Sequence, residues 1–483
     1  MAELQARPRL AVAGATGFVG QALAAKLRHR FRLLALSRSA SETPTGYHEL
    51  RRADLFSLSQ TRAALQGVDV AVYLVHSMMP SARLVQGHFR DLDLMCADNF
   101  AKAAKDCGVK RIVYVGGLLP AQGDDALSPH LASRLEVERA LGGTGVPVTT
   151  LRAGMVVGVQ GSSYQLVARL VRRLPVMVCP TWTQSRMQPI GLPDLVQAIG
   201  RSAEDASSQS HTYDVASGET MSYVQLLKAT ARTLGLKRWF VRVPFFSPRL
   251  SRLWVSLTTG APKALVAPLV ESLRHDMLVD PSRERQLPGF EPQSIWRHLE
   301  QAARDDSRGA PRAFRAPQPA KAGDIVHSVQ RFRMPSGRSA AWAAYCYLKW
   351  LPTAFFGVIR VTYSEERSCY EFRLAGWRQR LLALRIDHDS SHERRLVLRI
   401  VGGVLVRDVG RGYLEFRSTL ERQTLLVAIH DFAPSLPWWL YRVSQAQAHL
   451  FVMWRFRRHV QKLAAHPSGA DTAAMLAASD RAA

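Results

Sequence analysis

RLAVAGATGFVG, residues 9–20, joins a short apolar run to three glycines, Gly14, Gly17 and Gly20. Apolar residues then recur at helical spacing, so the stretch predicts a strand, a tight turn and a helix. In such a turn the first glycine bends the chain, the second lets backbone N–H groups approach a pyrophosphate, and the third allows close packing of the helix. We therefore expect a dinucleotide site built from Gly14, Ala15, Thr16, Gly17, Phe18, Val19 and Gly20.

Apolar runs and helical patterns continue to alternate along the first 150 residues. The apolar runs are Leu33–Leu36, Val68–Val75, Arg111–Val115 and Val146–Leu151, and the helical stretches include Asp91–Cys107 and Pro129–Leu141. Strands that alternate with helices form a parallel sheet, because each helix carries the chain back across a face of that sheet. The predicted fold class is a doubly wound α/β sheet of the Rossmann type.

The residues at the end of the second expected strand indicate whether the cofactor is NAD or NADP(H). NAD-binding sheets carry an acidic residue there for a ribose hydroxyl, whereas this chain has Ser37, Arg38 and Ser39. A guanidinium beside hydroxyls suits a 2′-phosphate, so NADP(H) is favoured over NAD, with an ordinary surface arginine as the alternative. Asp54 and Leu55, which close the third strand, are expected at the adenine, and the alternative for Asp54 is a helix cap.

Further motifs extend the pattern through the first 300 residues. They are VYLVHSM at 72–78, RIVYVGGL at 111–118, LRAG at 151–154, and QPI at 188–190 with Asp194. With the glycine turn, they make about residues 8–300 resemble the NmrA-like atypical short-chain dehydrogenase/reductases, a family of NADP-binding reductases, isomerases and non-catalytic redox sensors. The resemblance implies cofactor contacts from Val75, His76, Ser77 and Gly116, with His76 and Ser77 as turn residues in the alternative interpretation.

The residues that carry reduction in that family are replaced here. Its reductases use a Tyr-x-x-x-Lys pair on the helix after the fifth strand and a serine at that strand's end, where this chain has His130, Arg134 and Gly116-Gly117. Four residues apart, His130 and Arg134 share a helix face. His130 is then a candidate proton donor and Arg134 a candidate partner of the ribose hydroxyls. Cofactor binding without turnover and a merely structural helix start remain as alternatives.

A second domain of different character follows a change in composition. Residues 304–324 are rich in Pro, Arg, Ala and Asp and are expected to be a linker. Seven short β-rich runs come next, at Val326–Phe332, Val358–Tyr363, Cys369–Leu374, Leu381–Asp387, Arg394–Val401, Gly412–Ser418 and Thr424–Phe432. They predict an antiparallel sheet, and an apolar stripe from Trp439 to Val460 predicts one long helix after it.

This order of elements resembles the helix-grip fold of START-like and polyketide-cyclase-like proteins, which implies a cavity for an apolar ligand. Aromatic residues could line that cavity, contact a membrane interface or form the core: Trp342, Tyr345, Tyr347, Trp350, Phe355, Phe356, Trp438, Trp439 and Tyr441. The expected domains are residues 1–303 for the cofactor and substrate, a linker at 304–324, the α+β domain at 325–465, and a flexible tail at 466–483.

Composition limits the remaining possibilities. Lys and Arg number 64 against 39 Asp and Glu, which leaves a formal net charge of +25, and the hydrophobic content of 47% excludes disorder for most of the chain. Five scattered cysteines show no metal-ligand spacing, so no metal is expected. The start of the chain does not resemble a secretory signal, and we expect a cytoplasmic protein with peripheral contact at the inner face of the membrane and no specific nucleic acid partner.

Two functions are compatible with these features. The first is an NADP(H)-dependent oxidoreductase of a hydrophobic carbonyl or quinone-like substrate, for which an apolar pocket is expected from Trp182, Met187, Phe245, Phe246 and Trp254, unless these residues simply form core. The second is a non-catalytic NADP(H) sensor whose C-terminal domain binds a lipid-like ligand, because the usual Ser, Tyr and Lys are missing.

Overall fold

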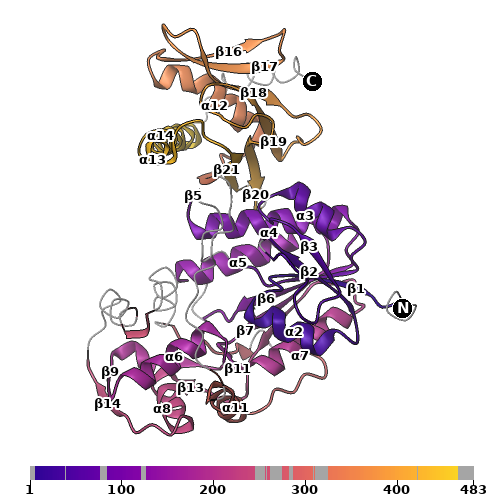
Figure 1. Cartoon of the computed structure of the whole chain (residues 1–483), viewed down its shortest axis with the longest axis vertical. Helices are drawn as coiled ribbons and strands as arrows, with labels where there is room; N and C mark the ends of the chain where they lie inside the picture. Colours follow the sequence, from indigo (N-terminus) through magenta and orange to yellow (C-terminus); the bar gives the residue numbers. More distant parts are fainter. Residues whose placement is uncertain are drawn as a thin grey trace. The chain divides into compact units, whose positions relative to one another are not determined.

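The computed structural model describes residues 6–38, 40–76, 84–120, 127–244, 256, 258–260, 275–281, 287–307, 309, 325–420 and 423–465. Contacts between Cα atoms divide the chain into two compact units (Figure 1). The first comprises Met1–Met79 and Cys96–Gln318, and the second comprises Pro80–Met95 and Pro319–Ala483.

A seven-stranded parallel sheet lies at the centre of the first unit, in the order β12-β7-β6-β4-β1-β2-β3. Its strands are β1 (Arg9–Ala13), β2 (Arg32–Ser37), β3 (Glu49–Arg52), β4 (Val70–Tyr73), β6 (Arg111–Gly117), β7 (Val148–Ala153) and β12 (His211–Val215). The chain reverses its direction of travel across the sheet between β1 and β4, which opens a crevice at the carboxyl ends of these strands. The predicted doubly wound fold is confirmed.

Helices flank this sheet (Figure 1): α2 (Phe18–Leu27), α3 (Leu58–Leu65), α4 (Phe89–Asp106), α5 (Pro129–Gly142) and α7 (Leu192–Glu204). Three further helices, α6 (Ser162–Arg173), α8 (Tyr223–Thr233) and α11 (Ile295–Ser307), pack with the short strands of the unit instead. Short pairs of strands complete the unit: β8 (Val156–Val157) with β11 (Ile190–Gly191), β9 (Val176–Cys179) with β14 (Trp239–Arg242), and β10 (Arg186–Met187) with β13 (Met221–Ser222). A short 3-10 helix, η2 (Thr181–Gln184), follows β9.

The glycine turn has the tight geometry that the sequence predicts. Gly14 has a φ of +92°, a conformation that residues with a Cβ rarely adopt. A Cβ on Gly20 would lie 2.4 Å from the Gly14 carbonyl oxygen and 2.7 Å from that of Ala15. The first turn of α2 therefore packs directly onto the loop after β1, as a dinucleotide-binding turn requires.

We expect Gly20→Ala to destabilise the protein and to weaken NADPH binding. The added methyl group collides with backbone, and overpacking of this kind costs about 1–3 kcal/mol. Urea unfolding and an NADPH titration measure the two effects. Gly142→Ala is the matched control, because nothing lies within 4 Å of its added Cβ. If Gly20→Ala binds NADPH as the wild type does, the turn is looser than the structure indicates.

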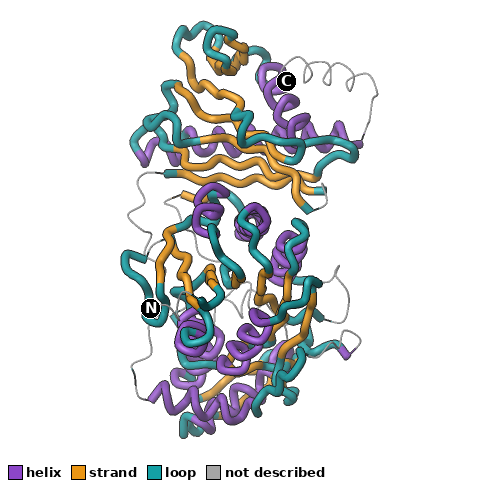
Figure 2. The backbone as a smooth tube through the Cα atoms, turned by 90° about the vertical axis from the view of Figure 1, so that its right-hand side faces the viewer, coloured by secondary structure: helices purple, strands orange, loops and turns teal. Residues whose placement is uncertain are grey.

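The second unit is built on an eight-stranded sheet in the order β16-β17-β18-β19-β20-β21-β15-β5. Seven strands are antiparallel neighbours: β15 (Val326–Arg333), β16 (Ile359–Ser364), β17 (Cys369–Leu374), β18 (Arg380–Ile386), β19 (Arg395–Gly402), β20 (Tyr413–Thr419) and β21 (Thr424–Phe432). Figure 2 shows these strands side by side. The predicted separate antiparallel domain is confirmed, whereas its likeness to START-like proteins stays a hypothesis.

Helices α12 (Ala340–Ala354) and α14 (Gln445–Ala465) pack on one face of this sheet. Side chains from both helices, among them Tyr347 and Phe456, belong to one buried apolar cluster with Leu398 and Phe416 of the sheet. The aromatic residues divide between core and surface. Tyr347 and Tyr441 are buried, Phe356 and Trp439 are exposed, and Trp342, Tyr345, Trp350, Phe355 and Trp438 are partly buried against the cluster.

The prediction of one long C-terminal helix is wrong at its start. Helix α13 (Trp438–Val443) ends at Ser444, and α14 begins at Gln445. Trp439 and Val443 are 70% and 63% exposed, so the apolar stripe that packs on the core begins only at Ala446. Apolar residues that happened to fall at helical spacing before the break extended the predicted stripe by two turns.

A segment from the first hundred residues belongs to the second unit. Strand β5 (Leu84–Gln86) pairs in parallel with β15, and the Gln86 side chain donates a hydrogen bond to the Ala446 carbonyl. The domain expected at residues 1–303 therefore lacks residues 80–95, which group with the C-terminal unit. A three-residue strand carries no readable alternation, and its partner lies about 240 residues away in the sequence, so sequence patterns could not assign it.

No helix among the described residues is both long and apolar enough to cross a bilayer.

Candidate functional site

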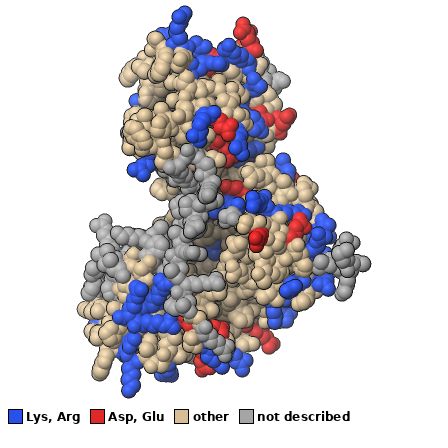
Figure 3. Space-filling view, in the orientation of Figure 1, with Lys and Arg blue, Asp and Glu red and all other residues tan. Residues whose placement is uncertain are grey.

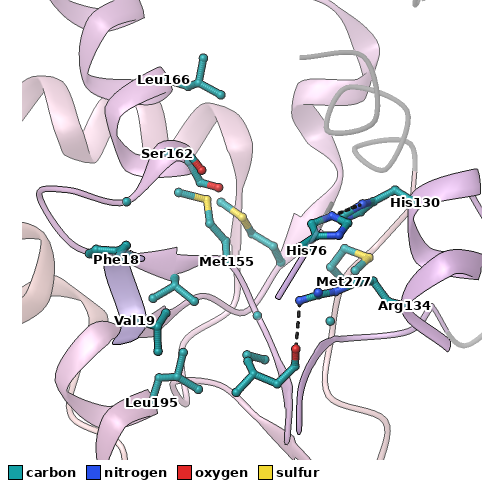
Figure 4. A pocket seen from close by; sticks show the side chains of 18 of the residues that line it. Phe18, Val19, His76, His130, Arg134, Met155, Ser162, Leu166, Leu195 and Met277 are labelled. Carbon is teal, nitrogen blue, oxygen red and sulfur yellow. Dashed lines mark hydrogen bonds between the residues drawn. The ribbon is translucent and has the colours of Figure 1, made fainter. Parts of the chain in front are cut away.

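A cavity of about 460 Å³ opens at the carboxyl ends of the parallel strands in the first unit. Of the residues predicted from the sequence, it is lined by Gly14, Gly17, Phe18, Val19, Gly20, His76, Gly116, His130 and Arg134. The glycine turn thus forms one end of the same cavity that holds both candidate catalytic side chains (Figure 4). The backbone cradle at Gly14 and Gly20, which a Cβ would fill, fits a dinucleotide pyrophosphate.

His130 and His76 form a hydrogen-bonded pair in this cavity. His130 lies in the first turn of α5, which Ser128 caps, and His76 follows the end of β4. The Nε2 atom of His76 is 3.3 Å from the Nδ1 atom of His130, and Figure 4 shows the two rings side by side, joined by this contact. If His76 donates, a neutral His130 carries its hydrogen on Nε2. Nε2 of His130 is then a proton donor. When it gives up its proton, Nδ1 of His130 can take another from His76.

Arg134 lies one turn further along α5, on the helix face that the sequence predicts. Its Nη2 donates to the Val115 carbonyl at 3.0 Å, and its guanidinium carbon is 5.7 Å from the centre of the Tyr114 ring. These contacts hold the guanidinium beside the end of β6 (Figure 4). They use only part of its donor capacity, since a guanidinium has five N–H groups. Positioning of ribose hydroxyls by Arg134 stays a prediction.

The residues expected at the adenosine end lie around the edges of β2 and β3. Arg38 is exposed at the end of β2, and the Ser37 hydroxyl accepts a hydrogen bond from the Ala40 backbone. Asp54 accepts from the Phe56 backbone N–H at 3.0 Å in a local turn, and the cap of the following helix α3, which was the alternative for Asp54, is Ser57. Leu55 is buried, and its carbonyl accepts from Asn99. None of these four lines the cavity.

Four other predicted cofactor contacts also lie outside the cavity wall or outside the described chain. Ala15 is buried within the glycine turn, and the carbonyl of the exposed Thr16 accepts a hydrogen bond from Gln21. Val75 is half-buried just before His76. Ser77 lies outside the described residues, as do Ser39, Phe245, Phe246 and Trp254.

The far wall of the cavity is apolar. Trp182 and Met187, which the sequence predicts for an apolar pocket, both line it. Most of this wall was missed, namely Met155, Leu166, Val167, Leu170, Leu195, Leu227 and Met277. Such residues carry no local signal, because an apolar side chain that faces a cavity has the same helical spacing as one that faces the core. Figure 4 shows Met155, Met277 and Leu166 around the space next to the histidine pair.

Ser162, Ser163 and Tyr223 are polar side chains in this wall, and the sequence carries no local signal for Tyr223. Tyr223 begins α8, and its ring packs edge-on against Trp182 at 6.2 Å between centroids. Burial raises the pKa of its phenol, so the hydroxyl stays protonated throughout the neutral range. Tyr223 therefore provides a second neutral donor group in the wall of the chamber.

Comparisons with known proteins agree with this geometry. Residues 14–172 match the model of a family described as NAD(P)H-binding. A stretch of 113 residues is 33% identical to Auxiliary protein GraX of Staphylococcus aureus, and it spans 23% of this chain and 37% of that relative's length.

Two solved structures illustrate the similarity of the first unit. Triphenylmethane reductase of Citrobacter sp., in complex with NADP(H), is 19% identical, with 61% of this chain and 99% of that chain covered and a TM-score of 0.48. MoeE5, in complex with UDP-glucose and NAD, is 19% identical, with 62% and 99% covered and a TM-score of 0.47. The family match over residues 14–172 confirms the expectation of a nicotinamide dinucleotide cofactor.

Proposed function

We propose that this protein is an NADP(H)-dependent reductase of a hydrophobic carbonyl or quinone-like substrate. One observation carries the proposal: a single cavity runs from the dinucleotide turn, past the His76–His130 pair, to a wall of apolar side chains. A substrate that is polar throughout would lose its hydration against the apolar part of this wall, where few side chains can replace its hydrogen bonds with water. A flat or extended apolar molecule with one reducible oxygen suits it, since Tyr223 and the two histidines line the same cavity and are hydrogen-bond donors for that oxygen.

The residues of this chain supply the proton that reduction requires. NADPH, when bound, provides the hydride. As the substrate oxygen gains negative charge, the His130 Nε2–H donates its proton, and Nδ1 takes one from His76 Nε2 across the 3.3 Å contact. The O–H bond forms as the N–H bond breaks, and the imidazole pair recovers its proton from solvent. Positioned donors of this kind contribute about 10²–10⁴ to the rate.

Turnover is tested by following the absorbance of NADPH with lipophilic quinones and aromatic aldehydes, and with pyruvate as a small polar control. We expect oxidation with at least one lipophilic class and none with pyruvate. Tight NADPH binding without turnover of any lipophilic substrate would contradict the proposal.

Arg38 supports NADP(H) as the form of the cofactor, because it is exposed at the end of β2 and free to meet a 2′-phosphate. We expect Arg38→Asp to weaken NADPH binding by roughly 30-fold, about 2 kcal/mol, while NADH binding changes little. Calorimetric titration with each cofactor measures both constants. Arg28→Asp is the control, since Arg28 follows the opposite end of α2. Equal losses for NADPH and NADH would show that Arg38 does not read the phosphate.

The competing function is a non-catalytic NADP(H) sensor whose second unit carries an apolar ligand in the manner of START-like proteins. Gly116 and Gly117 favour it, because they leave the end of β6 without the hydroxyl that reductases of the resembled family use. Native mass spectrometry of the purified full-length protein distinguishes the two. A co-purifying lipid-like molecule without reductase turnover supports the sensor, and turnover with an empty second unit excludes it.

A further inference from the structure

The parallel pair β9 and β14 has one buried face and one apolar face in solvent. On the inner side, Met177 packs into a cluster with Leu170 of α6 and Leu227 of α8. On the outer side, Val176 and Val178 of β9 lie next to Trp239 and Val241 of β14, in register. Trp239 is 76% exposed, and the three valines are between 41% and 50% exposed. Four adjacent apolar side chains on one small ribbon need an apolar partner.

Positive charge surrounds this ribbon. Segments 162–186 and 221–242, which contain α6, β9, α8 and β14, carry nine Lys and Arg and no Asp or Glu. Figure 3 shows basic side chains gathered over this part of the molecule. Among the described residues, Lys237 and Arg242 are exposed and have no ion-pair partner. Arg238, between the ribbon and α6, donates to the carbonyls of Val171 and Arg172, so its charge is not neutralised by these bonds.

A basic cavity adjoins the ribbon. It has a volume of about 350 Å³, and its lining includes Arg172, Arg238, Arg304, Thr233 and Ser307. Arg238 immediately precedes Trp239, so the cavity and the exposed apolar face share one segment of chain. Arg172 is paired with Asp306 at 2.6 Å and Arg304 with Glu300 at 3.6 Å. Of these three arginines, Arg238 alone has no carboxylate partner in the described part of the chain, so its guanidinium is the group that can bind a phosphate ester here.

We propose that this surface, defined by Val176, Val178, Trp239, Val241, Lys237 and Arg242, docks on a bilayer of anionic lipid. Trp and aliphatic side chains enter the interfacial region, while Lys and Arg bind the negatively charged headgroups. The basic cavity at Arg238 receives one lipid phosphate. A nucleic acid would use the cations but leave the four apolar side chains in water, so the lipid surface accounts for both features.

If the proposed function holds, the docking surface lies close to the substrate chamber. Leu170 and Leu227 pack beneath the ribbon and also line the 460 Å³ cavity. Helices α6 and α8 therefore lie between the docking surface and the substrate chamber. A lipophilic quinone-like substrate dissolved in the bilayer is then delivered to the wall of the chamber, which explains why a reductase of apolar molecules keeps this ribbon exposed.

The test is cosedimentation of the full-length protein with vesicles, without NADPH or substrate, so that its outcome does not depend on turnover. We expect binding to vesicles of phosphatidylglycerol and phosphatidylcholine in equal parts, weak binding to pure phosphatidylcholine, and a loss of binding with rising salt. Lys237→Glu/Arg242→Glu should reduce the partition coefficient by roughly 25-fold or more, because each basic residue contributes about fivefold. Trp239→Ser should also reduce it.

Trp296→Ser/Arg297→Glu is the matched control, since these exposed residues on α11 have the same types but lie outside the surface. It should bind vesicles as the wild type does. Equal losses in control and test variants would overturn the proposal, and so would equal binding to both kinds of vesicle. Competition with double-stranded DNA gives a further test. If DNA displaces the protein fully from vesicles, and displaces Trp239→Ser to the same extent, the surface binds phosphate and not a bilayer.

Discussion

His130→Phe should lower NADPH-dependent turnover by about 10²–10⁴ while the dissociation constant of NADPH stays nearly unchanged. Phenylalanine keeps a flat ring beside His76 but removes both nitrogens, and so removes the donor that faces the cavity. Stopped-flow kinetics with a lipophilic quinone separates the reduction step from cofactor binding.

Two companion variants assign the roles within the pair and its surroundings. His76→Phe should also slow turnover, because it removes the nitrogen that resupplies His130 Nδ1. Arg134→Ala should raise the KM for NADPH more than it lowers kcat, if its remaining N–H groups hold the ribose. Full activity of His130→Phe would exclude His130 as the acid, and Tyr223 would be the next donor to test.

Glu415→Ala should be the most destabilising single change in the second unit, by about 3–5 kcal/mol. The Glu415 side chain is fully buried in the sheet, ion-paired with Arg395 and with Arg417, whose Nε is 2.7 Å from Oε1. His430 Nε2 lies 2.8 Å from the other oxygen. Removal of the carboxylate takes this negative charge away from two buried guanidiniums. Urea unfolding measures the loss, and Glu415→Gln tests the charge without the change of shape.

The same carboxylate predicts a dependence of stability on pH. Burial alone raises the pKa of Glu415, but Arg417, Arg395 and His430 outweigh burial and hold the pKa well below its usual range. A depressed carboxyl pKa stabilises the fold at pH values above the unfolded value of about 4.3, and this contribution is lost as the pH falls through the folded value. Wild type should therefore lose stability below about pH 4 more steeply than Glu415→Gln.

Asp408→Ala is the control for this cluster. Asp408 pairs with Arg411 at 3.5 Å on the surface of the same unit, where such pairs contribute less than about 1 kcal/mol. If Glu415→Ala lowers the free energy of unfolding no more than Asp408→Ala does, the buried ion pairs contribute no more to stability than a surface pair.

Local sequence patterns located most of the elements. The seven β-rich runs after residue 325 all became strands, and two of them, Cys369–Leu374 and Thr424–Phe432, have the predicted bounds. The glycine turn was predictable to the residue, because a φ of +92° and a backbone at 2.4 Å admit only glycine. These signals are readable since each depends on residues within a few positions of one another.

The sequence by itself determined the parallel sheet, the dinucleotide turn and the shared helix face of His130 and Arg134, because alternation, glycine spacing and helical periodicity are local properties. Tertiary structure alone decided that His76 meets His130 across 54 positions and that β5 joins the second unit. It also decided that Val176 faces solvent while Met177 faces the core. Such pairings arise when distant segments bury their apolar surface together, and the identity of a residue does not record which segment will cover it.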